Sequence, residues 1–409
     1  MKKLILNGGW LLPVSSPPIK GGTVIIEGGT IVYVGKSKDE PCEADSLLGG
    51  ENIVLIPGLV NAHTHLELTA MEGKVGKGLS FKEWVEAVIS YRGGMSKEAV
   101  DNSIRQGVEI LISNGTTTVG DFTSTGRSAS ILAKLGLRGV AFNEIVSFRE
   151  DASQAAFKGV KDRIENGKKT TGIIQGIAPH SPYSVSASLL RDCHNYAEKM
   201  DIPISIHIAE TGEEKVFIDT GKGPLRDLLN SLGKWEESWQ VPGMSPVQYL
   251  SRLGALDGTI GVHLNLIDDA DIEILKERGV SVVYCPGSNR WFGREKVCPV
   301  ERLLAEGINV ALGTDGLSSN SNLSILEEMR LLKKEFPSIP DEEILKMGTL
   351  NGAKALRFGD IGAIETGFRG DLVGIRLENQ GGGPYNFLSD TKFQVEFVII
   401  GGKIVYKNH

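Results

Sequence analysis

The chain has 409 residues, 41% hydrophobic and 23% charged, a composition that fits a large globular enzyme and excludes a disordered or fibrous protein. Its net charge is −7 and it has no run of lysine or arginine, which excludes nucleic acid as a partner because phosphates require a concentrated positive field. No apolar stretch reaches the ~18 residues of a membrane span, and the N-terminus lacks a signal-peptide pattern. We therefore expect a cytoplasmic protein that acts on a small molecule, with a homo-oligomer as an open possibility.

The two ends of the chain carry similar patterns. Residues 24–33 have the sequence VIIEGGTIVY, and residues 398–406 have the sequence VIIGGKIVY. Each pattern favours a β-hairpin, because β-branched runs flank a glycine turn that tolerates positive φ. We expect the hairpins to pair in one small β-sandwich domain composed of residues 1–56 and 364–409.

Between these ends, residues 57–363 alternate short apolar runs with longer amphipathic segments, the pattern of repeated β-α units. Eight such runs predict a (β/α)₈ TIM-like barrel, whose catalytic groups follow the carboxyl ends of its strands. The predicted strands are residues 59–65, 116–122, 138–146, 172–180, 203–210, 259–265, 280–286 and 309–315.

Histidines gather at the predicted strand ends. His63 and His65 end the first strand, two residues apart, so both rings project to the same face, as bidentate metal binding requires. A single histidine on an apolar strand is more often a core residue, and an H-x-H pair is common by chance. Five histidines at or near strand ends favour a metal site, the others being His180, His207 and His263.

His207 and Asp315 complete a predicted ligand set. His207 lies near the end of the fifth strand, and Asp315 ends the eighth. Three nitrogens and one oxygen suit Zn²⁺, or alternatively Fe²⁺, and leave one position for water. Without the histidines, Asp315 would be interpreted as a loop-capping aspartate.

Glu210 follows His207 by three residues and is the candidate proton carrier. A carboxylate just beyond a metal ligand can act as a general acid-base. The alternative interpretation is a residue near the N-terminus of the next helix.

Five segments together resemble the amidohydrolase superfamily, in its branch of cytosine deaminases and triazine hydrolases. They are PGLVNAHTH, APHSPYSVS, HIAET, GVHLN and LGTDGLSSN, in the family's order along the whole chain. The resemblance implies the barrel and the β-sandwich described above. It also implies roles for seven residues: metal ligands His63, His65, His207 and Asp315, proton shuttle Glu210, water-orienting His263 and substrate contact His180.

The resemblance also implies the metal content and the reaction. Members with two metals bridge them by a carboxylated lysine at the end of strand four, whereas this strand ends in Pro179-His180, so one metal is expected. Glu210 is then expected to move a proton from water to a ring nitrogen. Asp315 is expected to pass the second proton to departing ammonia, which makes the reaction a hydrolytic deamination.

Substrate identity depends on the loops. The segment around Trp84 is similar to the loop that covers the base in nucleoside-type deaminases, although the spacing of Phe81 and Trp84 fits core packing equally well. The segments HLEL and YCPGSNRWFG resemble the aminodeoxyfutalosine deaminases of menaquinone biosynthesis. Deaminases of adenosine, methylthioadenosine and S-adenosylhomocysteine share most of these features. Glu67 is a candidate for binding ribose hydroxyls and Arg149 for an acidic tail, with solvated surface charges as the alternative for both.

Two other functions stay open at this stage. The same scaffold could hydrolyse another C–N or C–Cl bond on a heterocycle, such as a triazine or a cyclic amide, although ring protonation by Glu210 helps most when an amine leaves. A non-catalytic scaffold of the same fold is disfavoured because the full set of candidate metal ligands is present.

Overall fold

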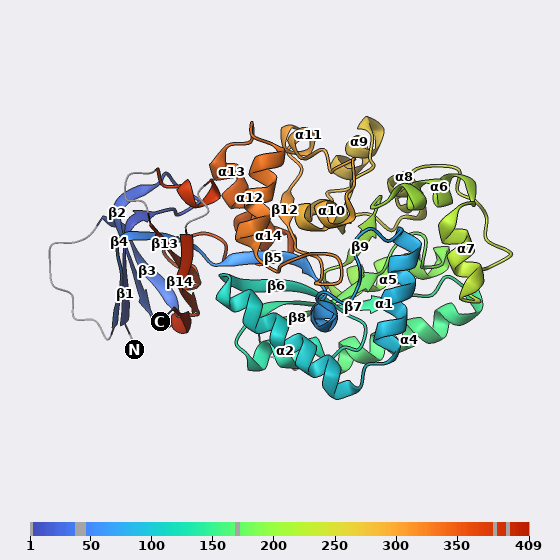
Figure 1. The fold of residues 1–409 in the computed structure, drawn as a ribbon, viewed down its shortest axis with the longest axis horizontal. Coiled ribbons are helices and arrows are strands. Elements are labelled where there is room, and N and C mark those ends of the chain that lie inside the picture. Colours follow the sequence, from blue (N-terminus) through green and yellow to red (C-terminus); the bar gives the residue numbers. More distant parts are fainter. Residues whose placement is uncertain (1–2, 37–45, 168–171, 379–382, 390–392, 409) are drawn as a thin grey trace.

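The computed structural model describes residues 3–36, 46–167, 172–378, 383–389 and 393–408. A β-rich unit that contains both chain ends lies beside a larger body in which helices surround strands (Figure 1). This is the predicted combination of a barrel with a small terminal domain.

The terminal unit is a seven-stranded sheet with the order β15-β14-β13-β4-β1-β2-β3. β4 joins the two ends of the chain, because it pairs in parallel with β1 and antiparallel with β13. Both predicted hairpins are present, as β2-β3 and β14-β15. The predicted limits of this domain, 1–56 and 364–409, stay a prediction. Its strands are β1 (Lys3–Leu11), β2 (Ile19–Glu27), β3 (Thr30–Lys36), β4 (Ser46–Pro57), β13 (Leu372–Leu377), β14 (Phe393–Ile400) and β15 (Lys403–Lys407).

The barrel consists of two parallel four-stranded sheets, β5-β6-β7-β8 and β9-β10-β11-β12. Single parallel bridges, Ile177 to Ile204 and Thr64 to Asp315, join the sheets at both seams and close the ring. Each strand overlaps one of the eight predicted runs, which confirms the barrel. The strands are β5 (Leu59–Thr64), β6 (Thr116–Thr123), β7 (Arg138–Ile145), β8 (Ile173–Pro179), β9 (Ser205–Ile208), β10 (Ile260–His263), β11 (Ser281–Tyr284) and β12 (Val310–Leu312).

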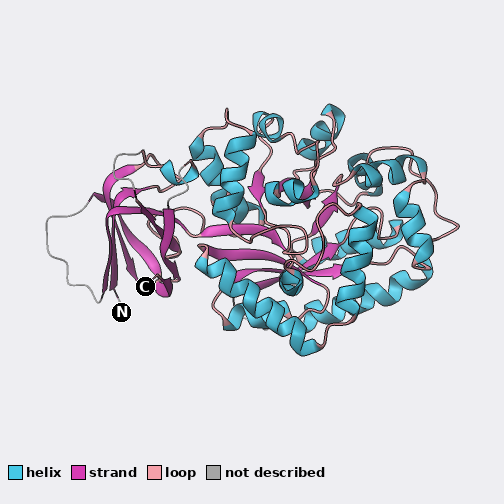
Figure 2. Ribbon diagram, in the orientation of Figure 1, coloured by secondary structure: helices cyan, strands magenta, loops and turns pink. Residues whose placement is uncertain are grey.

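Helices cover the outside of the barrel (Figure 2). Amphipathic spacing explains them: in α12, Ile325, Met329 and Leu332 are buried on one face, and the Ser324 hydroxyl caps the first turn. The helices are η1 (Leu66–Met71), α1 (Phe81–Gly93), α2 (Lys97–Ser113), α3 (Ser128–Lys134), α4 (Glu150–Gly167), α5 (Ala187–Met200), α6 (Gly212–Thr220), α7 (Pro224–Ser231), α8 (Pro246–Leu253), α9 (Asp269–Glu277), α10 (Pro286–Phe292), α11 (Val300–Ala305), α12 (Ile325–Glu335), α13 (Asp341–Met347), α14 (Leu350–Ala355) and η2 (Asn386–Leu388).

The helices and the cysteines bear on the environment of the chain. Among the described residues, no helix combines the length and the apolar character that a bilayer crossing needs. Cys193, Cys285 and Cys298 are buried free thiols, while Cys42 lies outside the described residues.

Candidate active site

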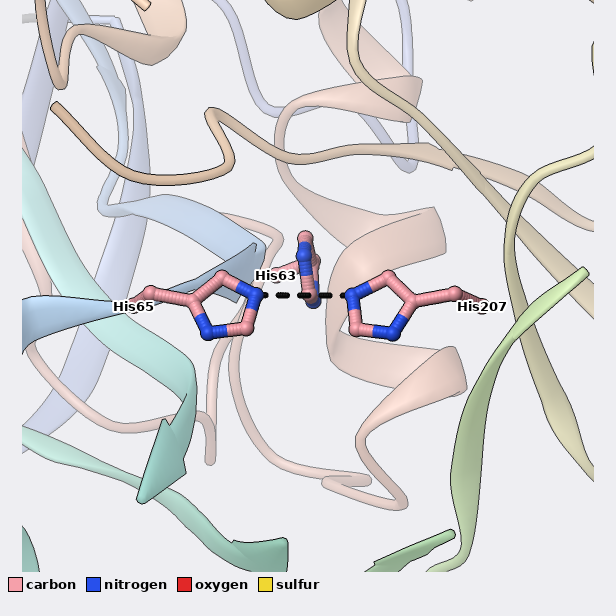
Figure 3. A group of neighbouring side chains, drawn as sticks. All are labelled: His63, His65 and His207. Atoms are coloured by element: carbon pink, nitrogen blue, oxygen red, sulfur yellow. Dashed lines mark hydrogen bonds between the residues drawn. The ribbon is translucent and has the colours of Figure 1, made fainter. Parts of the chain in front are cut away.

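Three histidines from two opposite strands meet at the mouth of the barrel (Figure 3). His63 and His65 come from the end of β5, and His207 comes from β9. One ligand nitrogen from each lies within 4.8 Å of the others, and Nε2 of His65 is 3.4 Å from Nε2 of His207. The sequence prediction that the rings of His63 and His65 project to the same face is confirmed.

Asp315 lies beside this cluster after β12. Its Oδ1 is 3.6 Å from Nε2 of His63 and 3.6 Å from Nε2 of His65. The Ser288 and Ser319 hydroxyls donate to its Oδ2 at 2.9 and 2.8 Å and fix the carboxylate. Gly313 permits the close approach of β12, because a Cβ at that position would lie 2.8 Å from Cβ of His63.

The histidines are prepared to act as neutral ligands. His207 donates from Nδ1 to the carbonyl of His180 at 2.8 Å, which leaves the lone pair of Nε2 toward the cluster. Burial lowers the pKa of His63 and, more strongly, that of His65, so both rings are neutral at pH 7.

The donor set fits a divalent metal ion. Both ring nitrogens of His63 are buried and make no hydrogen bond, an unfavourable state that a metal ligand does not share. Imidazole nitrogens with one carboxylate oxygen are a set that Zn²⁺ and Fe²⁺ accept. His63, His65 and His207 are therefore a candidate metal centre, with Asp315 within reach as a fourth ligand.

Glu210 and His263 adjoin the histidine cluster. Oε1 of Glu210 is 3.8 Å from Nε2 of His263, whose ring centroid is 5.5 Å from that of His207. Burial lowers the pKa of His263 to about 3. Burial alone would raise the pKa of Glu210, but His263, Arg294 and His207 outweigh it and lower the pKa to about 2. Glu210 is thus held as a buried carboxylate beside His263 and Arg294.

The backbone is strained where these side chains leave the barrel. Ala209, His263, Leu264 and Asp315 have φ values of 51°, 76°, 49° and 56°, a region that non-glycine residues rarely occupy. Such conformations persist where surrounding contacts hold them, and they cluster at functional sites. The strain therefore indicates that the functional site lies at the carboxyl ends of β9, β10 and β12.

Two buried side chains that the sequence analysis missed hold the Glu210 segment in place. The Glu214 carboxylate accepts from the backbone N–H groups of Ala209 and Glu210 at 3.0 and 2.8 Å. Asn265 donates from Nδ2 to the carbonyl of Glu210 at 3.1 Å. Asn265 is the last residue of the quoted segment GVHLN, and Glu214 lies three residues after HIAET, but their roles depend on contacts that spacing alone does not reveal.

Arg294 is a third residue that the sequence analysis missed. It donates from Nη2 to Oε1 of Glu210 at 2.6 Å, and both side chains are largely buried, at 13% and 8% exposed. Arg294 follows α10 and lies outside every motif quoted above, so no sequence signal linked it to the site.

Glu210 is one of the residues that line a pocket of about 400 Å³. This volume is large enough for a small ligand. The pocket walls come from the start of α1, the segment after β9 and the segment after α10. They include Phe81, Leu266, Phe292 and Arg294. The pocket therefore combines aromatic and apolar side chains with charged ones, among them Glu210.

His180 and Trp84 flank the site. The His180 ring centroid is 5.0 Å from that of His207, and Ser181 and Ser184 engage its Nδ1. Trp84 stacks on Phe81 and donates from Nε1 to the carbonyl of Ser318 at 2.8 Å, so α1 is tied to the loop after β12. Phe81 is buried and Trp84 is half-buried, which fits core packing, and the role of Trp84 in covering the base stays a prediction.

The structure corrects the interpretation of Glu67. It is not a surface charge, because it is buried at 4% exposure. The hydroxyls of Thr123, Ser124 and Thr125 already donate to its oxygens at 2.6 to 2.8 Å, which also leaves little capacity for ribose hydroxyls. Glu67 thus holds the loop after β6.

Arg149 lies on the surface of the protein. It is exposed and forms an ion pair with Asp151, which matches the alternative of a solvated surface charge. Contact with an acidic tail stays a prediction for this residue.

Comparison with known proteins agrees with this geometry. Residues 54–405 match the amidohydrolase family. The 5-methylthioadenosine/S-adenosylhomocysteine deaminase of Thermoanaerobacter pseudethanolicus is 32% identical over 430 aligned residues, covering 100% of this chain and 94% of that relative. The 5′-deoxyadenosine deaminase of Methanocaldococcus jannaschii is 32% identical, covering 94% and 91%.

Solved structures have the same fold. An adenosine deaminase from Xanthomonas campestris with bound zinc superposes with a TM-score of 0.84 at 26% identity, covering 98% of this chain and 92% of that one. The Helicobacter pylori aminofutalosine deaminase in complex with methylthio-coformycin gives 0.86 at 23% identity, covering 98% and 100%. At 23% identity, the similarity to the Helicobacter pylori structure concerns the fold alone.

Proposed function

The chain belongs to the amidohydrolase family, and we propose that it is a metal-dependent hydrolytic deaminase of an adenine nucleoside. The observation that carries this proposal is the buried Glu210 carboxylate, which is 3.8 Å from Nε2 of His263 and lines a pocket together with Phe81 and Phe292. Relatives over 30% identical that cover nearly the whole chain are named as deaminases of adenine nucleosides, which supports the same reaction here.

His63, His65, His207 and Asp315 are the proposed ligands of one divalent metal, with Zn²⁺ preferred and Fe²⁺ as the alternative. The metal supplies Lewis acidity and lowers the pKa of a water molecule toward ~7. The Xanthomonas campestris structure, which has bound zinc, supports this choice of metal.

The chain's own groups carry out the proton transfers. Glu210 takes a proton from the attacking water and gives it to the ring nitrogen beside the amino-bearing carbon, which becomes more electrophilic. His263 lies next to Glu210 and stabilises the oxygen that attacks this carbon. Asp315 passes the second proton to the departing amine. Water and the aminated ring are thereby converted to ammonia and a ring carbonyl.

The substrate is an adenine nucleoside that is modified at its 5′ position. The curated relatives are named for methylthioadenosine, S-adenosylhomocysteine and 5′-deoxyadenosine, which share adenine and differ at that position. Aminodeoxyfutalosine, to which two sequence segments pointed, has the same adenine group. His180 and Trp84 are the proposed contacts to the base.

A panel of adenine nucleosides tests the proposed reaction. We expect ammonia release from at least one of adenosine, 5′-deoxyadenosine, methylthioadenosine, S-adenosylhomocysteine and aminodeoxyfutalosine. The product should be the corresponding hypoxanthine nucleoside, measured by the loss of adenine absorbance. Hydrolysis of a chlorotriazine or a cyclic amide, with no ammonia from any nucleoside, would contradict the proposal.

Metal content tests the proposed centre. We expect about one divalent metal per chain, because the ligands form one cluster and β8 ends in Pro179-His180, without the lysine that bridges two metals. Elemental analysis of the purified protein measures the ratio. Two equivalents per chain would overturn the single-metal assignment.

A further inference from the structure

Arg294 makes three contacts that hold it against Glu210. Its Nη2 donates to Oε1 of Glu210 at 2.6 Å, a distance typical of a charge-assisted hydrogen bond. Its Nη1 donates to Oδ1 of Asn289 at 3.1 Å, and its guanidinium lies over the Phe292 ring, 4.3 Å from the centroid. Arg294 and Glu210 also line the same pocket.

Arg294 bonds the Glu210 oxygen that is directed toward His263. Oε1 is 3.8 Å from Nε2 of His263, so the same oxygen is directed toward the histidines and bonded to the guanidinium. A ring nitrogen that exchanges a proton with Glu210 must come within hydrogen-bond reach of that carboxylate. A heterocycle that approaches Oε1 from the side of His263 therefore competes with Arg294 for this oxygen.

The position of Arg294 in the chain is suited to movement. It follows Gly293, which ends α10 with a φ of 65°, and it begins residues 294–299, a segment that belongs to neither α10 nor α11. Its backbone N–H donates to the carbonyl of Asn289. The guanidinium can therefore leave Glu210 without unwinding a helix.

We propose that Arg294 is a displaceable clamp on Glu210, a specificity-determining residue that leaves the carboxylate when the heterocycle binds. This inference rests on the proposed function. A heterocycle with an amino group beside a ring nitrogen replaces the lost hydrogen bond, because its N–H groups reach the same carboxylate. A ring that lacks this amidine edge, such as one with chlorine at that carbon, does not replace it. The clamp thus selects heterocycles that carry an amine. It also weakens the binding of every ligand, because the Arg294–Glu210 contact must first be broken and the free energy of that step is subtracted from the binding free energy.

Arg294→Met removes the charge and keeps the length of the side chain. We expect KM for the nucleoside identified in the panel to fall roughly 10- to 100-fold, because a hydrogen bond to a charged group contributes about that factor. The kcat should stay within about threefold of wild type, because Arg294 has already left Glu210 in the enzyme-substrate complex. Arg294→Lys keeps the charge and should stay near the wild-type KM. Arg290→Met is the matched control, because Arg290 is an exposed arginine on the neighbouring helix α10.

Binding of inosine to the metal-loaded enzyme supplies a second readout that needs no turnover. Calorimetry should show tighter inosine binding in Arg294→Met than in wild type. In the Glu210→Gln background the same substitution should change the affinity less than about twofold, because the clamp has lost its charged partner. A fall in kcat with unchanged KM would show that Arg294 instead positions Glu210 during catalysis and would overturn the clamp.

Two further outcomes separate this inference from the proposed function. Unchanged KM and inosine affinity in Arg294→Met, in an enzyme that still releases ammonia, would overturn the clamp alone. Tighter inosine binding in Arg294→Met, with no ammonia from any nucleoside, would overturn the deaminase assignment while keeping the competition for Glu210.

Discussion

Glu210→Gln should lower kcat by roughly 10² to 10⁴ while leaving the metal content at the wild-type level. Glutamine keeps the size of the side chain and its hydrogen-bonding capacity, but it cannot take up and release a proton. The residues proposed to hold the metal are not changed, so any loss of rate reports on the chemistry. Steady-state kinetics on the nucleoside identified in the panel, together with elemental analysis, measures both quantities.

The control for this variant is Glu198→Gln, the same substitution on the exposed face of α5. It should leave kcat, KM and metal content unchanged. If Glu210→Gln turns over within about threefold of wild type, Glu210 is not the proton carrier and the proposed mechanism is wrong.

The barrel could be predicted because its strands have a local signal. Buried parallel strands are rich in apolar residues, and the apolar residues of Leu59–Thr64 and Arg138–Ile145 supply that signal although both strands also carry polar side chains. The later strands are shorter than predicted: β12 covers Val310–Leu312 only, because the chain leaves the ladder before Asp315, which has a positive φ. Strand ends are set by such local backbone geometry, which apolar patterning does not encode.

The histidine cluster could be predicted because topology alone brings it together. In a closed parallel barrel the carboxyl ends of all strands meet at one mouth, so His63 and His207 become neighbours despite their separation in the sequence. The contacts of Glu214, in the first turn of α6, and of Asn265 and Arg294, in loops, follow from the direction of each side chain. No spacing rule reports that direction, and these residues therefore became visible only in the structure.

Glu67 shows how a charged residue can be misassigned from sequence. Its hydrogen-bond donors, Thr123, Ser124 and Thr125, lie more than 50 residues later in the chain, so nothing near Glu67 indicates that it is buried. A carboxylate is stable in the interior only when such donors surround it. The barrel supplies them because β5 and β6 are adjacent strands whose ends meet.

His63→Ala should abolish metal binding and activity while the fold is kept. His63 is fully buried, and neither of its ring nitrogens makes a hydrogen bond, so alanine breaks no hydrogen bond in the protein. What is lost is packing against neighbours such as Phe122, whose ring centroid is 4.6 Å away, and a buried cavity of this kind costs a few kcal/mol. Since even loss of an outer partner of a ligand weakens metal binding 10- to 100-fold, loss of a direct ligand should weaken it further.

The thermal unfolding temperature, measured with and without added Zn²⁺, separates this role from a purely structural one. A ligand that binds only the folded state stabilises it by mass action, so Zn²⁺ should raise the Tm of the metal-free wild type and leave that of His63→Ala unchanged. His194→Ala is the matched control, because His194 is a buried histidine on α5 that bonds the carbonyl of Asp257, away from the cluster. This control should lower the Tm yet keep the full response to Zn²⁺. An equal response in His63→Ala and wild type would exclude His63 as a ligand, whatever happened to the activity.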